Sequence, residues 1–102
     1  MFENNPAKRY VVSVLVEDKP SALTRVTGLF ARRNFNIHAL AVGPTNVKGI
    51  SRITILTDEY NASIHQIANQ LQRLIHVLEV TVLDDNKSEE MQNKLADLGN
   101  IE

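Results

Sequence analysis

An α+β fold with the element order β-α-β-β-α-β is predicted by three features of this 102-residue sequence. Four short segments are rich in β-branched residues or alternate apolar with polar residues. Two segments between them repeat apolar residues at helical spacing, and turn-forming residues separate the segments. This order is that of the ferredoxin-like split βαβ fold, in which two right-handed crossovers place both helices on one face of a four-stranded antiparallel sheet.

The first strand and the first helix are predicted at residues 10–16 and 22–33. The strand is almost continuously β-branched, which indicates that both of its faces are covered. The helix carries an apolar stripe on one side and basic residues elsewhere. The stripe consists of Ala22, Leu23, Val26, Leu29 and Phe30.

Both ends of this helix have residues suited to end a helix. Asp18 or Ser21 can cap its start with a side-chain oxygen. Arg32 and Arg33 fall in the last turn, where cations interact favourably with the helix dipole. Asn34 follows, and asparagine is the usual substitute for glycine in the left-handed conformation that ends many helices.

The second half of the chain supplies two strands, a helix and a last strand, at residues 36–43, 51–57, 61–75 and 78–82. The inward positions of the first of these strands are out of phase, and a β-bulge near His38 reconciles them. The predicted inward residues are Ile53, Ile55, Ile64, Ile67, Ala68, Leu71, Leu74, Ile75, Leu78, Val80 and Val82.

One sheet face is left without helices in this fold. Its predicted residues include Ser13, Arg52 and Thr54, which are polar enough to face water. The strands at the edges of the sheet remain available for pairing with a second copy. We therefore expect a homodimer that forms through the sheets.

The chain is long enough for one domain. We expect a flexible N-terminus at residues 1–8, a folded domain at 9–85 and a polar tail at 86–102. Met91, Leu95 and Leu98 give the tail the apolar spacing of a short helix. No cysteine, signal peptide or membrane-spanning run is present in the sequence, so a cytoplasmic protein is expected.

Composition argues against nucleic acid and membranes as partners. The net charge is −1, which gives no electrostatic attraction to phosphates or to anionic lipid. RNA-binding modules of the same fold place aromatic residues on the open sheet face, and the predicted strand at 51–57 has none.

Catalytic groups are also hard to assemble from this sequence. His38, His65 and His76 do not have the spacing of metal ligands, and the acidic pairs at 58–59 and 84–85 follow strands as solvated turn residues do. The four glycines are dispersed and form no phosphate-binding loop. We therefore predict no enzyme activity, no metal site and no catalytic residues in this chain.

The junction between the first strand and the first helix is the strongest candidate for a binding site. The amides of Ser21, Ala22 and Leu23 start a helix, where unpaired N–H groups and the helix dipole favour a carboxylate. Lys19 adds positive charge, and Asp18 can accept a hydrogen bond from an ammonium group. A free amino acid carries both charges. The alternative is that Asp18 and Ser21 only cap the helix.

At this junction the sequence resembles the ACT-domain family, whose effector loop reads Asp/Asn-x-Pro-Gly-x-Leu. The corresponding run, Asp18-Lys19-Pro20-Ser21-Ala22-Leu23, differs at one position. Read together, the segments 15–20, 28–30, 35–37, 41–45, 51–55 and 66–75 resemble the regulatory small subunit of acetohydroxyacid (acetolactate) synthase. This resemblance covers residues 9–85.

The resemblance implies a regulatory, non-catalytic subunit in branched-chain amino-acid biosynthesis. Its partner would be a large catalytic subunit that holds thiamine diphosphate and Mg²⁺, while this chain holds no cofactor. It implies that the small subunit activates the large one and mediates feedback inhibition, typically by valine. The effector would lie at the interface of an ACT dimer, between the loop of one copy and the second strand of the other.

Carried over by position, the implied effector site has two parts. One copy would contribute Asp18, Lys19, Pro20, Ser21, Ala22 and Leu23. The other copy would contribute Asn36 and Ile37, with Val42 and Gly43 as further candidates. The Asn36 amide can both donate to a carboxylate and accept from an ammonium group, whereas its structural alternative is a turn residue after Phe35.

Two departures from the family pattern leave alternatives open. Ser21 stands where the family usually has glycine, so its side chain could crowd an effector or donate a hydrogen bond to it. Family members commonly continue into a second ferredoxin-like domain, and this chain is expected to be a short form or a truncated one. The runner-up function is a stand-alone amino-acid-binding ACT regulator of another metabolic enzyme. A small enzyme on the same fold is the third candidate.

Overall fold

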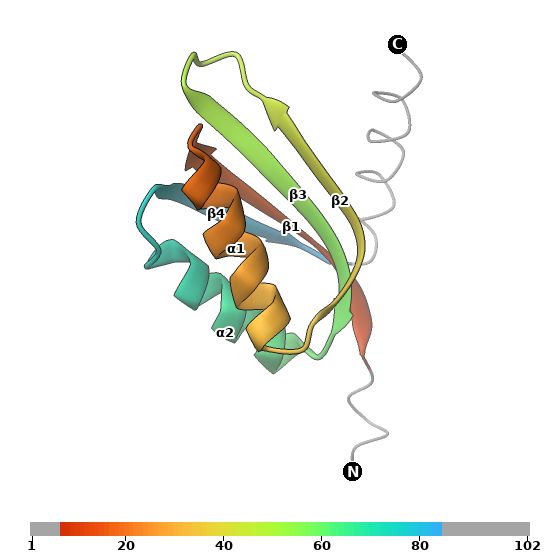
Figure 1. The fold of residues 1–102 in the computed structure, drawn as a ribbon. Helices are drawn as coiled ribbons and strands as arrows, with labels where there is room; N and C mark the ends of the chain where they lie inside the picture. Colours follow the sequence, from red (N-terminus) through yellow and green to blue (C-terminus); the bar gives the residue numbers. More distant parts are fainter. Residues whose placement is uncertain (1–6, 85–102) are drawn as a thin grey trace.

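The chain forms one four-stranded antiparallel sheet with two helices, and the computed structural model describes residues 7–84 (Figure 1). The element order is β-α-β-β-α-β, as predicted. The elements are β1 (Lys8–Glu17), α1 (Pro20–Arg32), β2 (Asn36–Pro44), β3 (Ile50–Glu59), α2 (Asn61–Gln72) and β4 (Val77–Leu83).

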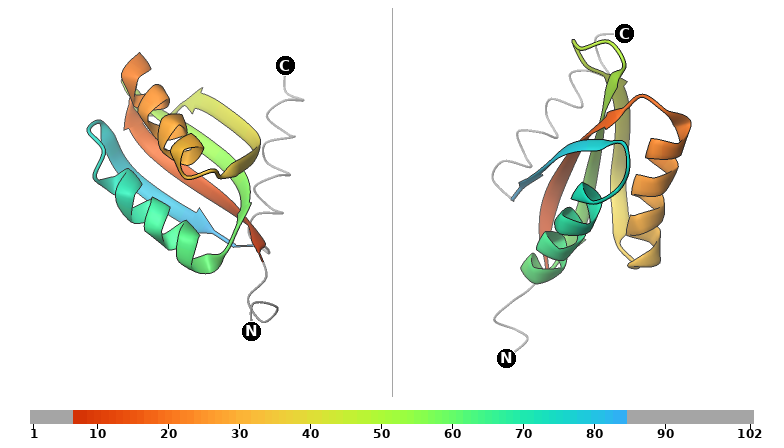
Figure 2. Two further views of the ribbon diagram at one scale, coloured as in Figure 1. Left: turned by 60° about the horizontal axis from the view of Figure 1, so that its bottom comes forward. Right: turned by 90° about the vertical axis from the view of Figure 1, so that its left-hand side faces the viewer.

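The strand order across the sheet is β2-β3-β1-β4. β1 therefore lies in the middle between β3 and β4, while β2 forms one edge. Figure 2 shows both helices on the same face of this sheet, as the element order predicts. The side chains of β1 confirm that a continuously apolar strand is covered on both faces, because Val11 and Val12 point to opposite faces and both are fully buried.

The start of α1 differs from the prediction. Pro20 is the first helical residue and Lys19 precedes it as the N-cap, with no side-chain capping bond. Proline suits this position because its fixed φ matches the helix and its missing N–H would have had no partner there. Neither Asp18 nor Ser21 caps the helix, since Asp18 lies before the N-cap and Ser21 lies inside the first turn.

The end of α1 confirms the prediction for Asn34. This residue has a φ of 60°, in the left-handed region. Its N–H donates to the carbonyl of Ala31 and the N–H of Phe35 donates to that of Phe30, both at 3.0 Å. This pair of bonds is the Schellman motif, and the rings of Phe30 and Phe35 supply its apolar contact at a centroid distance of 5.5 Å.

The bulge predicted near His38 is present in β2. The pairing with β3 shifts register between Ile37 and Ala39, which leaves His38 as the extra residue. Leu40 and Val42 then share the helix-covered face with Ile37, although all three stay partly exposed because β2 is an edge strand.

Two predictions about the last helix and strand were wrong. α2 ends at Gln72, so Ile75 lies beyond it and is 61% exposed. Leu78 is 53% exposed rather than inward, because β4 shifts register against β1 between Leu15 and Val16 and pairs through Val77 and Glu79 around it. A bulge of this kind turns the extra residue away from the face that strict alternation assigns to it.

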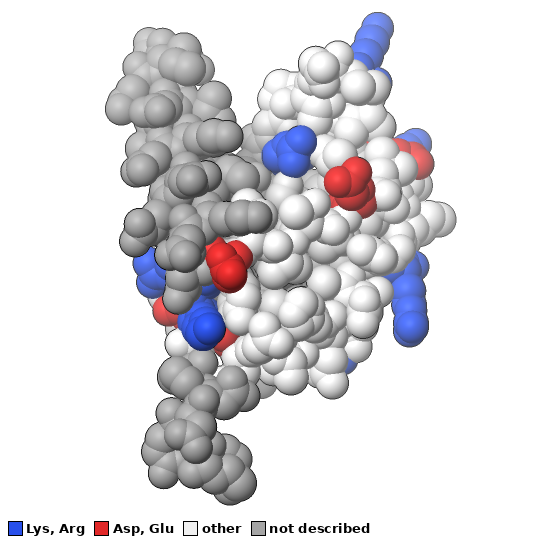
Figure 3. All heavy atoms as spheres, turned by 180° about the vertical axis from the view of Figure 1, so that it is seen from behind, with Lys and Arg blue, Asp and Glu red and all other residues white. Residues whose placement is uncertain are grey.

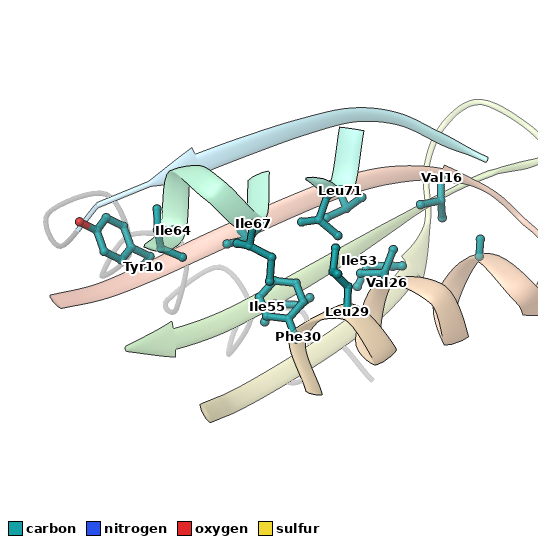
Figure 4. Packing of buried hydrophobic residues seen from close by; sticks show 13 residues of the cluster. Tyr10, Val16, Val26, Leu29, Phe30, Ile53, Ile55, Ile64, Ile67 and Leu71 are labelled. Atoms are coloured by element: carbon teal, nitrogen blue, oxygen red, sulfur yellow. The ribbon is translucent and has the colours of Figure 1, made fainter. Parts of the chain in front are cut away.

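A single hydrophobic core lies between the sheet and the two helices (Figure 4). Ile64, Ile67 and Leu71 of α2 reach the sheet, as do Val26, Leu29 and Phe30 of α1. The sheet contributes Tyr10, Val12, Val14, Val16, Ile53 and Ile55. Every second residue of β1 and β3 therefore packs on the helices, which is the period expected for strands.

Two of the polar residues predicted to face water on the sheet face away from the helices are buried instead. Ser13 and Thr54, which are directly opposite each other on β1 and β3, are only 4% and 5% exposed. Both lie on the two central strands, and the guanidinium of Arg52 donates to the Ser13 hydroxyl at 2.7 Å. Seen from this side, the described surface carries isolated charges of both signs rather than a basic patch (Figure 3).

The predicted chain ends fall mostly outside the described residues. The tail at 86–102 lies entirely outside them, as does most of the N-terminus at 1–8. Lys8 differs from its predicted place, because it is the first residue of β1 and pairs with Glu59. Within residues 7–84, neither helix has the length and apolarity needed to span a bilayer.

We predict that Ile55→Ala lowers the free energy of unfolding by about 2–5 kcal/mol, because the truncated side chain leaves a cavity between β3 and the helices. Urea denaturation followed by circular dichroism measures this change. Leu78→Ala is the matched control, and its half-exposed side chain should cost no more than about 0.5 kcal/mol. Similar losses for the two variants would contradict the assignment of the core.

Candidate functional site

A surface pocket of about 170 Å³ lies where the β1–α1 loop meets the ends of β2 and β3. It is lined by the last residues of β1, the loop and the first turn of α1, and by residues of the two neighbouring strands. The lining residues are Val16, Glu17, Asp18, Lys19, Pro20, Leu23, Val42, Ser51 and Ile53. The pocket thus has a polar side formed by the loop and an aliphatic side formed by strands and helix.

Backbone hydrogen bonds fix the loop on two sides. The N–H of Glu17 donates to the carbonyl of His76 at 2.9 Å, before β4 begins. The N–H of Asp18 donates to the carbonyl of Gly49 at 2.8 Å, in the connection between β2 and β3. The N–H of Lys19 closes a tight turn onto the Glu17 carbonyl at 2.7 Å. The three amides of the loop are therefore used within the chain.

The first turn of α1 consequently offers fewer amides than predicted. Pro20 has no N–H, and the N–H of Ala22 donates to the Lys19 carbonyl at 2.9 Å. Ser21 is the second helical residue, which is too early for its N–H to reach a carbonyl of the same helix. Its amide is thus available for an anion at the helix start.

The aliphatic side of the pocket comes from three elements. Leu23 of α1 is partly buried, Val42 of β2 is 50% exposed and Ile53 of β3 is fully buried. Val42 and Ile53 are opposite each other in the β2–β3 ladder, so their side chains lie on the same face. An aliphatic side chain can pack on this wall without burying a polar group.

Four of the eight residues predicted as effector ligands line this pocket, namely Asp18, Lys19, Pro20 and Leu23. Ser21 is exposed beside it, whereas Ala22 is 1% exposed and packs in the core beneath.

Asn36 and Ile37 lie elsewhere in the same chain. They begin β2, and Val42 in the pocket is six residues further along the strand, roughly 20 Å away. The Asn36 carbonyl accepts a hydrogen bond from the Thr57 hydroxyl, and Ile37 is 36% exposed at the sheet edge. One copy of the chain therefore does not bring Asn36 or Ile37 to the loop.

Sequence reasoning missed Val16, Glu17, Ser51 and Ile53 as pocket residues. The sequence pattern assigns Ser51 and Ile53 only to a strand, although the β-α-β-β order places the start of the third strand beside the end of the first. That adjacency was the available signal. Nothing in the sequence pattern predicted the hydrogen bond from the Glu17 N–H to the His76 carbonyl.

A cluster of ionisable groups lies at the opposite end of β3. Arg9 donates to Asp58 through Nε at 3.0 Å, and His38 Nε2 lies 2.9 Å from the other carboxylate oxygen. Asp58 was predicted to follow the strand, but β3 extends through Glu59 and holds it between β1 and β2. The hydrogen bond from Arg9 lowers the pKa of Asp58, and the hydrogen bond from His38 lowers it further. Partial burial of the carboxylate opposes both effects.

Within residues 7–84, no group of three or more histidine, aspartate or glutamate side chains is arranged to hold a metal ion. The Arg9–Asp58–His38 cluster is formed by an ion pair and a neighbouring imidazole. The cluster lies at the other end of β3 from the pocket, so it is not part of the candidate site.

A ferredoxin-like sheet with a pocket at the β1–α1 loop has the arrangement of an ACT domain. Residues 12–79 match the family model described as an AHAS small subunit-like ACT domain. The chain is 48% identical over 81 residues to the acetolactate synthase small subunit of Mycobacterium bovis, a match that covers 79% of this chain and 48% of that protein. It is 44% identical over 85 residues to the one from Mycolicibacterium smegmatis, which covers 83% and 50%.

A solved structure gives the same relationship. The crystal structure of the acetolactate synthase small subunit from Thermotoga maritima superposes with a TM-score of 0.68 at 39% identity, and the match covers 74% of this chain and 47% of that one. The chain therefore belongs to the family of acetohydroxyacid (acetolactate) synthase small subunits with an ACT domain. It spans about half the length of the curated relatives it matches.

We predict that Asp58→Asn flattens the loss of stability in acid. Because the folded-state pKa of Asp58 lies below its usual value of 3.8, the stabilisation is present above that pH and is lost as the pH falls through the folded-state value. Urea unfolding between about pH 2 and 5 measures this, and the effect should be small because the side chain is 40% exposed. Identical pH profiles for wild type and variant would contradict it.

Proposed function

We propose that this chain is the regulatory ACT domain of an acetolactate synthase, and that its β1–α1 pocket binds a branched-chain amino acid, most simply valine. One observation carries the proposal. A loop with both a cation and a carboxylate, next to an available helix-start amide, faces an aliphatic wall in one small pocket. A free aliphatic amino acid has the three matching groups.

Each part of such a ligand has a partner at the pocket. The α-carboxylate would accept from the N–H of Ser21 at the start of α1, with Lys19 as the nearby positive charge. The α-ammonium would donate to the Asp18 carboxylate. The side chain would pack against Leu23, Val42 and Ile53, whose combined surface is aliphatic.

A second copy of the chain would complete the site. The outer edge of β2 has no neighbouring strand in the described sheet, so its backbone groups are available for pairing. Sheet-to-sheet pairing of two copies along β2 would bring Asn36 and Ile37 of one copy toward the loop of the other, as the family resemblance implies. The exposure of Leu40 and Val42 on this edge supports such a dimer.

The catalytic partner would be the large subunit of the synthase. We propose that the small-subunit dimer raises the activity of this subunit and that bound valine reverses the effect as feedback inhibition. Thiamine diphosphate and Mg²⁺ would bind to the large subunit, and this chain would be non-catalytic. The assembly would act in the cytoplasm, in valine, leucine and isoleucine biosynthesis.

Ser21 is compatible with this function on conformational grounds. It lies inside α1, and among the described residues other than glycine only Asn34 and His76 have a positive φ. The backbone therefore does not need glycine at position 21. The remaining requirement is space for the serine side chain, and Ser21 is exposed.

The second candidate is a stand-alone amino-acid-binding ACT regulator of another metabolic enzyme. It shares the pocket and the dimer, and differs only in the partner. Assaying an acetolactate synthase large subunit with and without this chain separates the two. An amino acid that binds without any change in synthase activity would favour the stand-alone regulator.

We predict that valine raises the melting temperature of the full chain, because a ligand that binds only the folded state stabilises it. Leucine and isoleucine are measured in parallel. Val42→Thr keeps shape and strand propensity but puts a hydroxyl on the aliphatic wall, so it should weaken valine binding several-fold. Val47→Thr is the matched control on an exposed valine outside the pocket. No shift with any of the three amino acids would refute the sensor function.

We predict that the chain sediments as a dimer and that Leu40→Lys shifts it toward monomer. A lysine at this edge position places two like charges near each other across the paired β2 strands. Val47→Lys adds the same charge at a side chain of similar exposure outside β2, and should leave the dimer intact. A monomeric wild type, or equal dissociation of both variants, would contradict pairing through this edge.

A further inference from the structure

We propose that His76 is a positioning residue for the effector loop: its side chain holds Glu17 and thereby sets the geometry of the pocket. The inference rests on the proposed function, because it concerns the same pocket. His76 belongs to the turn between α2 and β4 and is not among the pocket-lining residues. It would act on the ligand through Glu17 only.

Two hydrogen bonds join these residues, which are 59 positions apart in the sequence. The backbone N–H of Glu17 donates to the carbonyl of His76 at 2.9 Å. The His76 ring nitrogen Nδ1 lies 3.1 Å from Glu17 Oε1. A carboxylate can only accept, so Nδ1 carries the proton in this contact. The His76 side chain is 22% exposed and that of Glu17 is 43% exposed, so the pair is partly shielded from water.

The backbone of His76 shows why a histidine side chain is well placed there. Its φ is 77°, in the left-handed region that asparagine, aspartate and histidine tolerate better than most residues. Gly49 has a φ of 85° and accepts the N–H of Asp18, the next residue of the loop. Backbone hydrogen bonds thus attach the loop to two turns with left-handed residues, one on each side. On the His76 side, a side-chain contact adds to the backbone bond.

The consequence for the pocket follows from the shared residue. Glu17 lines the pocket and begins the tight turn in which Lys19 returns to its carbonyl. A shift in the backbone position of Glu17 would displace the adjoining Asp18 and Lys19, the two charged groups proposed to receive the ligand. The imidazole therefore fixes ligand geometry from outside the pocket.

His76→Gly separates this role from a purely structural one. Glycine suits a φ of 77°, so the variant should melt at the same temperature as wild type or higher, yet bind valine several-fold more weakly in calorimetry. Glu17→Ala should weaken binding by a similar factor, whereas Glu17→Gln, which keeps an acceptor oxygen for His76 Nδ1, should leave the backbone amides of Asp18 and Lys19 as protected as in wild type. The Glu17→Ala/His76→Gly double variant should lose no more than either single one, because both remove the same contact.

A control and a ligand-free measurement make the outcome decisive. His65→Gly changes an exposed histidine in α2, and should lower the melting temperature without changing the dissociation constant of the folded protein for valine. Amide hydrogen exchange at Asp18 and Lys19 in the free protein should accelerate in His76→Gly and Glu17→Ala but not in Glu17→Gln. Wild-type affinity and exchange in His76→Gly would overturn the positioning role alone. Failure of the wild type to bind valine, leucine or isoleucine overturns the proposed function, and the exchange data still decide whether His76 holds the loop.

Discussion

Burial of β1 on both faces is the constraint on which the rest of this structure depends. Because its successive side chains are nearly all apolar, β1 would expose apolar area to water at the edge of the sheet, so a position in the middle is favoured. In the order β2-β3-β1-β4 it has that position, with β3 and β4 beside it. That position leaves β2 as an edge and brings the end of β1 between the β2–β3 connection and the turn before β4. The pocket lies at this convergence.

The same convergence determines what the pocket can bind. Its loop is short and its amides are bonded within the chain, so the loop presents side-chain charges and a helix-start amide rather than a ring of N–H groups. A site of this kind suits a small zwitterion better than a phosphate, which is usually bound by several backbone amides. In the proposed function, the aliphatic wall would distinguish amino acids by their side chains.

Two features that depend on local chain chemistry were predictable from the sequence. Asn34 ends α1 because asparagine accepts a left-handed φ, and the bulge at His38 follows from a break in alternation within one strand. Features that depend on pairing between distant segments were not. Leu78 alternates correctly in its own strand, and only its register against β1 turns it outward. For the same reason, the sequence predicted only part of the pocket. Asp18 and Lys19 lie in one sequence motif, whereas strand pairing brings Ser51 and Ile53 to the pocket.

The position of Asn36 has a consequence for how such a regulator would behave in a cell. It lies at the far end of β2 from the loop, so in the proposed dimer no single copy holds a complete site. Ligand binding and self-association are then thermodynamically linked, and each must strengthen the other by the same factor. Dilution of the protein would lower its apparent affinity for the amino acid. The response would depend on the abundance of the regulator as well as on the level of the metabolite.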